Sequence, residues 1–264
     1  MDIFQTIILA LIQGLTEFLP ISSSAHLLFP SKLFNWPDQG LAFDVVLHLG
    51  TLSAIVYYYR YSLRLMSSDF FYSFKTRQLT ADAKLAWGVL LGTIPVGLAG
   101  LLFKDFIEVN LRSIEVAAYT TIVFGLLLGL SDWIHRKKDK FREVIGWSDV
   151  VIIGAFQAIA LVPGTSRSGI TITAALLLGL SYKLSLKFAF LLSIPVIILS
   201  TLLMSIDLAN SANTIDWLSL LLGFVISAVA AYATISMFIR LVDRVGMLPF
   251  VLYRLLLGGL LFLL

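Results

Sequence analysis

Two short polar stretches in an otherwise apolar chain contain the side chains that could do chemistry. The first reads QGLTEFLPISSSAH over residues 13–26, and the second reads PGTSRSG over residues 163–169. Burying carboxylates, guanidinium groups or unpaired backbone in hydrocarbon costs free energy, so a strongly apolar protein has such groups mainly where they form a site. These two stretches are therefore the candidate functional site.

The first stretch predicts two helices that meet at a polar turn. Gln13 and Glu17 are four residues apart, so both lie on one face of a helix that must end around Pro20. His26 falls in or near the first turn of a second helix, and that helix can be capped by a run of three hydroxyls, Ser22, Ser23 and Ser24.

Such a turn suits a phosphate, because hydroxyls and the free N–H groups of a helix N-terminus attract anions. The carboxylate of Glu17 would repel that phosphate. A divalent cation between the two is the simplest reconciliation, and Glu17 and Gln13 are oxygen ligands of the kind that hard cations prefer.

The second stretch supplies positive charge. Pro163 and Gly164 turn the chain, and Arg167 offers a planar fork that grips phosphate through two hydrogen bonds. Further hydroxyls come from Thr165, Ser166 and Ser168. If the two stretches meet near the middle of a membrane, Arg167 would face Glu17 and His26. Taken singly, each of these residues could be structural; their joint occurrence favours a site.

Composition requires a membrane to hold these stretches. Of 264 residues, 59% are hydrophobic and 13% charged, and the mean hydropathy is +0.94, which predicts an all-α, polytopic integral membrane protein. Since a transmembrane helix needs roughly 20 apolar residues, we expect six spans, at residues 42–59, 85–103, 116–134, 188–206, 217–239 and 249–264. The net charge of +3 is accounted for by basic loops between spans, so nothing indicates nucleic-acid binding.

Residues 3–33 and 150–180 are also apolar, but proline and small polar residues break each near its middle. Each is expected to form a re-entrant helical hairpin. Basic residues collect in the loops after the first and third spans, which should therefore be cytoplasmic, with both termini outside. The chain is then a single membrane domain of two inverted repeats, about 1–135 and 149–264. A constant offset of 143 residues aligns the two polar stretches, pairing Pro20 with Pro163.

Four polar features outside the stretches have simpler interpretations. His48 could pair locally with Asp44 or line the site. Arg254, five residues into the last expected span, could extend to the cytoplasmic surface, and His135 is expected to be solvated. The basic run at residues 136–142 is expected to anchor the chain at the lipid headgroups.

The motifs together resemble a known family. Gln13 to Glu17 looks like an (E/Q)xxxE motif, and PGTSRSG, FLPISSSAHL, FDVVLHLGT and LPFVLYRLLLG are similar to segments of the undecaprenyl-diphosphatase family of bacterial inner-membrane phosphatases, the bacitracin-resistance type. The resemblance implies hydrolysis of undecaprenyl diphosphate to the monophosphate and phosphate, which regenerates the lipid carrier for peptidoglycan synthesis. It also implies a divalent cation, Mg²⁺ or Ca²⁺. Many members have Glu where this chain has Gln13, so Glu17 must do more of the metal binding.

Carried onto this chain, the resemblance makes Glu17 a metal ligand or base and Arg167 the diphosphate clamp, with Ser23 and His26 at the reacting phosphorus. The attacking group stays open between Ser23, which we favour, His26 and water. Apolar surfaces around the hairpins would hold the polyprenyl tail, and phosphate would leave to the periplasmic or outer side. The oligomeric state is open, with a homodimer as one option.

A transporter is the competing function class. Inverted repeats with broken helices near the midplane also build transporters, in which Glu17 and Arg167 would bind a lipid phosphate or a small anion. A transporter does not need a serine, a histidine and an acid around an anion cradle, whereas hydrolysis does. The residues therefore favour the hydrolase.

Overall fold

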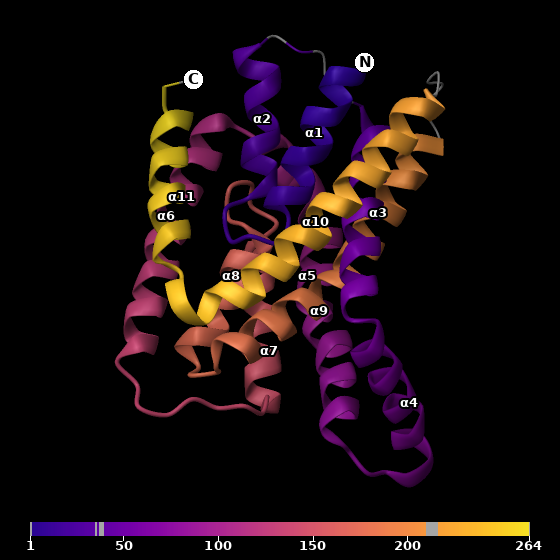
Figure 1. Cartoon of the computed structure of the whole chain (residues 1–264), viewed down its shortest axis with the longest axis vertical. Coiled ribbons are helices and arrows are strands. Elements are labelled where there is room, and N and C mark those ends of the chain that lie inside the picture. Colours follow the sequence, from indigo (N-terminus) through magenta and orange to yellow (C-terminus); the bar gives the residue numbers. More distant parts are fainter. Residues whose placement is uncertain (1, 35, 37–39, 210–215, 264) are drawn as a thin grey trace.

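The computed structural model describes residues 2–34, 36, 40–209 and 216–263, and its regular elements there are all helices (Figure 1). They are α1 (Ile3–Thr16), α2 (Ser23–Leu33), α3 (Leu41–Tyr58), α4 (Arg60–Thr76), α5 (Ala81–Asn110), α6 (Ile114–Arg136), α7 (Trp147–Ile159), α8 (Arg167–Leu177), α9 (Tyr182–Ala209), α10 (Trp217–Val245) and α11 (Leu248–Leu261). The expected all-α architecture is confirmed.

Five of the described helices are long and apolar enough to cross a membrane: α3, α5, α6, α9 and α10. They coincide with the first five expected spans. The sixth, expected at residues 249–264, is α11, whose 14 residues reach only about 21 Å at the helical rise of 1.5 Å per residue. The hydrocarbon core is roughly 30 Å thick, so α11 is short for a full span.

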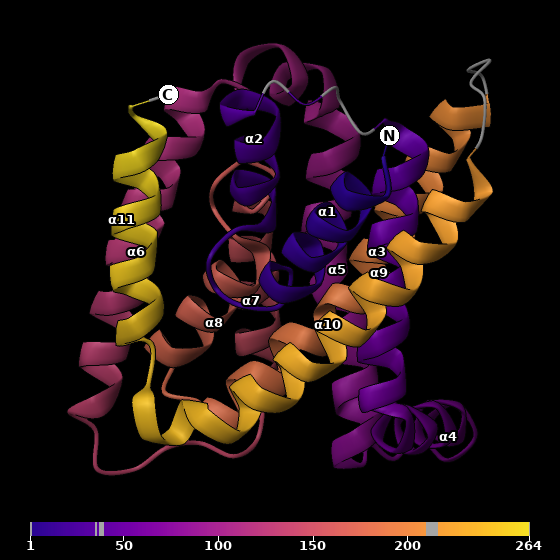
Figure 2. The same ribbon diagram turned by 45° about the horizontal axis from the view of Figure 1, so that its top comes forward.

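The two broken segments are helical hairpins that enter the molecule from opposite ends. In Figure 1, α1 and α2 descend from the end that holds both termini, while α7 and α8 rise from the other end, and the two turns meet in the middle. Figure 2 shows the same arrangement from a second direction. The connection between α9 and α10, expected to face outward, includes residues 210–215, which lie outside the described residues.

Glycines let each hairpin approach the long helices closely. A Cβ on Gly14 of α1 would lie 2.6 Å from the Ser227 carbonyl oxygen of α10, and one on Gly154 of α7 would lie 2.7 Å from the Gly92 carbonyl oxygen of α5. The hydrophobic effect does not drive helices together in lipid. Small residues at such crossings let the helices associate through close van der Waals packing instead. The hairpins are thus fixed against the spans by backbone-to-backbone packing.

The structure corrects the sequence interpretation of residues 60–84. Their basic residues predicted a loop, but residues 60–76 form α4, which packs against α5. The helix persists because its apolar positions recur at helical spacing, as in Leu63, Met66 and Phe70. The charges of this segment indicated a loop, whereas its apolar periodicity indicates a helix.

His135 is buried, so the expectation that it is solvated was wrong. Its ring stacks on Phe141 with centroids 4.1 Å apart and meets Tyr182 edge-on at 4.5 Å. The basic loop next to His135 packs back against the protein, where the backbone N–H of Arg142 donates to the Gly179 carbonyl oxygen. Arg142 in that loop donates two hydrogen bonds to Asp149, at 3.0 and 2.7 Å, and this pairing raises the pKa of the Arg142 guanidinium.

Candidate functional site

The first hairpin turns at Ser22. Helix α1 ends at Thr16, the Glu17 N–H still donates to the Gln13 carbonyl oxygen (3.0 Å), and Ser22 then adopts φ 71°. The Ser22 hydroxyl caps α2 by accepting from the Ala25 N–H at 3.4 Å. A positive φ at a residue with a Cβ costs of order 1–3 kcal/mol, so it persists only where the surroundings require it. The turn is built to present the start of α2.

The second hairpin repeats this geometry. Ser166 has φ 69°, and its hydroxyl accepts from the Gly169 N–H at 3.2 Å to cap α8. The two capping serines also contact the serine two residues on, Ser22 with Ser24 at 3.1 Å and Ser166 with Ser168 at 3.3 Å. Equivalent residues therefore differ by 144 in number, not by the 143 expected from aligning the prolines. The error arose because Pro20 lies two residues before its capping serine and Pro163 lies three before.

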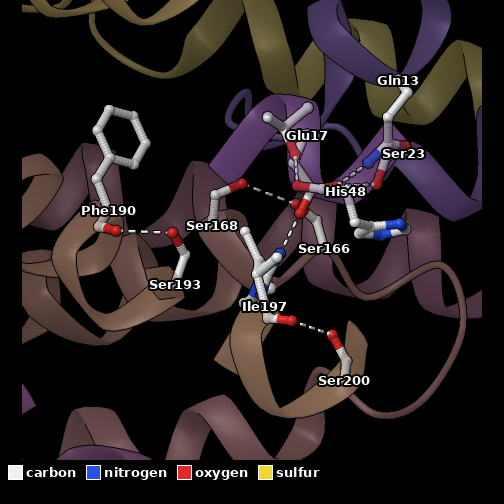
Figure 3. Close-up of polar contacts among 12 residues, drawn as sticks. Gln13, Glu17, Ser23, His48, Ser166, Ser168, Phe190, Ser193, Ile197 and Ser200 are labelled. Carbon is white, nitrogen blue, oxygen red and sulfur yellow. Dashed lines mark hydrogen bonds and ion pairs between the residues drawn. The ribbon is translucent and has the colours of Figure 1, made fainter. Parts of the chain in front are cut away.

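The two hairpin turns touch through an ion pair. The Arg167 guanidinium donates to Glu17 Oε1, across 150 residues of sequence. The other carboxylate oxygen, Oε2, accepts from the Gln13 amide at 2.9 Å and from the Ser23 hydroxyl at 2.8 Å (Figure 3). The expected encounter of Arg167 with Glu17 is confirmed, and Ser23 joins it.

A cavity of about 210 Å³ opens at this contact. Six of the residues that the sequence analysis singled out as site residues line it: Glu17, Ser22, Ser23, Ser24, Ser166 and Arg167. Its apolar wall includes Val96 and Val196, each directly after a proline inside a long helix. Because proline removes a helical hydrogen bond, both helices are locally weakened where they border the cavity. The lining combines a polar floor with an apolar side.

His26 lies outside this lining. Its Nδ1 pairs with the Ser22 carbonyl oxygen at 2.7 Å, its Nε2 pairs with the Tyr253 hydroxyl at 2.7 Å, and the two rings stack. A carbonyl only accepts, so Nδ1 bears the proton and Nε2 accepts from Tyr253. The structure therefore does not place His26 against Arg167 as expected, and its catalytic role stays a prediction.

His48 is the histidine that lines the cavity. The sequence left open whether it pairs locally or lines the site, and it does both. Its Nδ1 donates to the Asp44 carbonyl oxygen at 2.8 Å, one turn earlier in α3. That hydrogen bond fixes the ring orientation and leaves Nε2 as the ring nitrogen available to a ligand.

Other predicted residues hold the second turn in place. Gly164 has φ 85°, and a Cβ there would lie 2.3 Å from the Ala117 carbonyl oxygen, so only glycine fits. The Ser168 hydroxyl donates to the Leu19 carbonyl oxygen of the first hairpin at 2.9 Å. Thr165 is buried, and its hydroxyl has no hydrogen-bond partner among the described residues. Gly164 and Ser168 thus position the turn, and none of the three residues lines the cavity.

Arg254 is the residue that sequence reasoning missed. It was expected to extend to the surface, but it is fully buried and donates to five backbone carbonyl oxygens. The acceptors are Pro20 (3.4 Å), Thr120 (3.4 Å), Thr121 (3.0 Å), Gly164 (3.0 Å) and Thr165 (2.9 Å). Three of the acceptors, Pro20, Gly164 and Thr165, lie in non-helical turns, whose carbonyls have no water to bond inside a membrane, so Arg254 satisfies them from α11. That requirement was the available signal: two predicted turns in hydrocarbon needed a donor.

Comparison with known proteins identifies the family. Residues 6–260 match the family model described as Bacitracin resistance protein BacA. The chain belongs to the BacA family. It is 61% identical to the undecaprenyl-diphosphatase of Vesicomyosocius okutanii, over 99% of both chains. It is 54% identical to undecaprenyl-diphosphatase 2 of Stutzerimonas stutzeri, over 99% of this chain and 97% of that one. The resemblance seen in the motifs is confirmed, and with five helices able to span a membrane this BacA chain is a multi-pass membrane protein.

The described residues of this BacA chain contain no group of three or more His, Cys, Asp and Glu side chains that could hold a metal ion. The Gln13 side-chain oxygen is nevertheless buried without a hydrogen-bond partner among them, one helical turn before Glu17. An orphaned amide oxygen next to a carboxylate fits a hard cation that takes its remaining ligands from phosphate oxygens. The predicted pair of ligands, Glu17 and Gln13, is thus compatible with such a cation.

Proposed function

We propose that this chain is an undecaprenyl-diphosphatase, which hydrolyses undecaprenyl diphosphate to undecaprenyl phosphate and inorganic phosphate. Relatives with that name are 50–61% identical over nearly the full length. The observation that supports the reaction best is the junction of Glu17, Arg167 and Ser23, contributed by two hairpins of opposite entry. There the Ser23 hydroxyl, which would attack, and the Arg167 guanidinium, which would bind phosphate, both donate to Glu17, which would accept the proton.

The diphosphate would bind at the junction, where the N-termini of α2 and α8 and the guanidinium of Arg167 all favour negative charge. Arg167 would exchange part of its pairing with Glu17 for the phosphate oxygens. The polyprenyl tail would lie along the apolar wall that includes Val96 and Val196. This arrangement would bring the terminal phosphorus beside Ser23.

Ser23 is the favoured nucleophile, because its hydroxyl already donates to Glu17. Its oxygen would attack the terminal phosphorus as Glu17 takes the proton. The bond to the bridging oxygen breaks, and undecaprenyl phosphate leaves. Water would then release phosphate from Ser23 and restore the hydroxyl. Throughout, Arg167 stabilises the charge on the phosphoryl oxygens.

A divalent cation, Mg²⁺ or Ca²⁺, is part of the proposal. Glu17 and Gln13 would hold it, and when bound it would neutralise the charge of the diphosphate. The chain's own residues orient the phosphate and move the proton from Ser23.

In the cell, we propose that the protein works in the bacterial inner membrane with its site open to the periplasmic or outer side. There it would recycle the lipid carrier used in peptidoglycan synthesis and confer resistance to bacitracin. The transporter alternative is not favoured, because the close relatives have a phosphatase name and the cavity combines a serine with an acid.

Phosphate release from undecaprenyl diphosphate by the purified protein in detergent tests the proposal, with and without Mg²⁺ or Ca²⁺. We expect metal-dependent release that Glu17→Ala and Arg167→Ala both abolish, while Arg240→Ala, an exposed position on α10, has no effect. Absence of release from folded wild-type protein would contradict the proposal and revive the transporter.

A further inference from the structure

Helix α4 is joined to the rest of the molecule through one face. Phe70 packs on Trp87 of α5 with ring centroids 4.8 Å apart, and the Ser73 hydroxyl accepts from the Trp87 indole N–H at 3.2 Å. Leu63 and Met66 complete the face at helical spacing. Figures 1 and 2 show α4 at the edge of the molecule, at the end opposite the termini.

The opposite face of α4 is both aromatic and basic. Tyr61, Leu65 and Tyr72 are 64%, 58% and 52% exposed, and their spacing of four and seven residues places them along one stripe. Arg64 and Lys75 are exposed three residues after Tyr61 and Tyr72, so they border this stripe. Asp69, the only acidic residue of α4, borders the stripe four residues after Leu65 and accepts from the Thr80 hydroxyl. A basic and aromatic exposed face is typical of a helix lying in the plane of a membrane surface.

A hollow of about 320 Å³ lies where α4 ends. Its walls are aromatic, formed by Phe74 of α4, Trp87 of α5 and Trp147 of α7. Arg77, directly after α4, is the only charged residue among the described residues that line it. Lys84 extends over the Trp147 ring, with its Nζ 5.7 Å from the ring centroid.

We propose that α4 lies on the membrane surface and that this hollow binds the phosphate headgroup of an anionic glycerophospholipid. Charge complementarity supports the choice. Arg77 has no ion pair among the described residues, Lys84 lies over the Trp147 ring of the hollow, and no carboxylate is among the described residues that line it. Tryptophan is enriched at the depth of the lipid headgroups, because its ring has an apolar body and a polar N–H that can face water. The basic residues of α4 would draw the same leaflet's anionic lipids to the site.

The bound lipid would act at a distance from the catalytic cavity. Helix α5 contributes Trp87 to the hollow and Val96 to the cavity, nine residues further along the same helix. A headgroup fixed at the hollow would therefore set the depth at which α5, and with it the apolar wall of the cavity, lies in the bilayer.

Fluorescence quenching tests the site, because two of the chain's five tryptophans line the hollow. Brominated phosphatidylglycerol and brominated phosphatidylcholine are titrated separately into the full-length protein in detergent micelles. We expect phosphatidylglycerol to quench at lower concentration. Removing two cations that contact the headgroup, in Arg77→Gln/Lys84→Gln, should raise the phosphatidylglycerol concentration for half-quenching about 30-fold and leave the phosphatidylcholine curve unchanged.

The matched control is Arg240→Gln/Arg244→Gln, which removes the same charge from exposed positions near the end of α10. This control should stay close to wild type, and so should Arg77→Lys with Lys84 retained, which guards against loss of fold in the double variant. Equal quenching of the wild-type protein by the two lipids would overturn the proposal. So would an equal shift in the α10 control, since it would show attraction by net charge alone.

Discussion

The α1–α2 and α7–α8 hairpins have similar backbone conformations at their turns but carry different side chains. At the offset of 144 residues, Ser22 corresponds to Ser166, and both are caps with positive φ. The next residue is Ser23 in one hairpin and Arg167 in the other, each at the first position of its helix. Glu17 likewise corresponds to Leu161, and both line the cavity. Residues that shape the turn are alike, whereas those that would react are different.

This difference teaches how a symmetric scaffold makes an asymmetric site. Attack on a phosphorus needs a nucleophile with its base on one side and positive charge around the phosphoryl oxygens. Two identical turns would place two acids or two arginines against each other, and like charges at that distance repel. The comparison therefore predicts that each hairpin has its own separable role.

The largest effect is expected from the first hairpin's nucleophile. Ser23→Ala removes the attacking oxygen and should lower kcat at least about 10³-fold, as measured by phosphate release. Ser200→Ala is the control, because Ser200 also lines the cavity but donates to the Ile197 carbonyl oxygen. If Ser23→Ala kept more than a tenth of the activity, the attack would have to come from water or His26.

The second hairpin's equivalent residue should contribute charge and shape. Arg167→Lys keeps the cation and the pair with Glu17 but loses the planar fork, so kcat/KM should fall about 10²-fold while the protein stays folded. Thermal unfolding and phosphate release are measured on the same preparation. Wild-type activity in this variant would mean that a point charge suffices.

Arg254 tests whether the two turns depend on one common support. Arg254→Met strands buried carbonyl oxygens of both hairpins and should lower the free energy of unfolding by at least about 3 kcal/mol. Denaturant unfolding in detergent measures it. Arg254→Lys, which still donates, should lose less; an equal loss in both variants would point to packing instead of hydrogen bonding.

A smaller effect is expected at the partner of His26. Tyr253→Phe removes one hydrogen bond to the Nε2 atom of His26 and should lower kcat about three- to tenfold. The rate is compared with that of Tyr119→Phe, an exposed tyrosine on α6. A loss as large as that of Ser23→Ala would show that the ring orientation of His26 is itself essential.

Sequence predicted the fold well where hydrophobic length decides it. Five spans, two broken hairpins and their opposite entry follow from apolar runs, prolines and the distribution of lysine and arginine. The contact of Glu17 with Arg167 was also predictable, since each charge needed a partner in hydrocarbon. Helix α4 was missed because its basic residues suggested a loop, although its apolar positions recur at helical spacing.

The remaining errors depended on distances that sequence does not contain. Arg254 lies five residues into an apolar run, close enough to its end for the side chain to reach the surface. Only the positions of the Gly164 and Thr165 carbonyls show why it is buried instead. His26 and His48 could not be ranked for the same reason. His26 pairs with Tyr253, 227 residues later, whereas His48 lines the cavity.

The ion pair between the hairpins has a consequence for how the protein is made. Glu17 is synthesised 150 residues before Arg167, so during translation its carboxylate enters the membrane well ahead of its partner. Burying an unpaired carboxylate in hydrocarbon costs free energy. We therefore expect the first hairpin to remain near the membrane surface until the second half is inserted. Assembly of the site is then a late event of biogenesis, and a ribosome stalled before residue 167 would hold a chain that has its first three spans, α3, α5 and α6, and lacks its site.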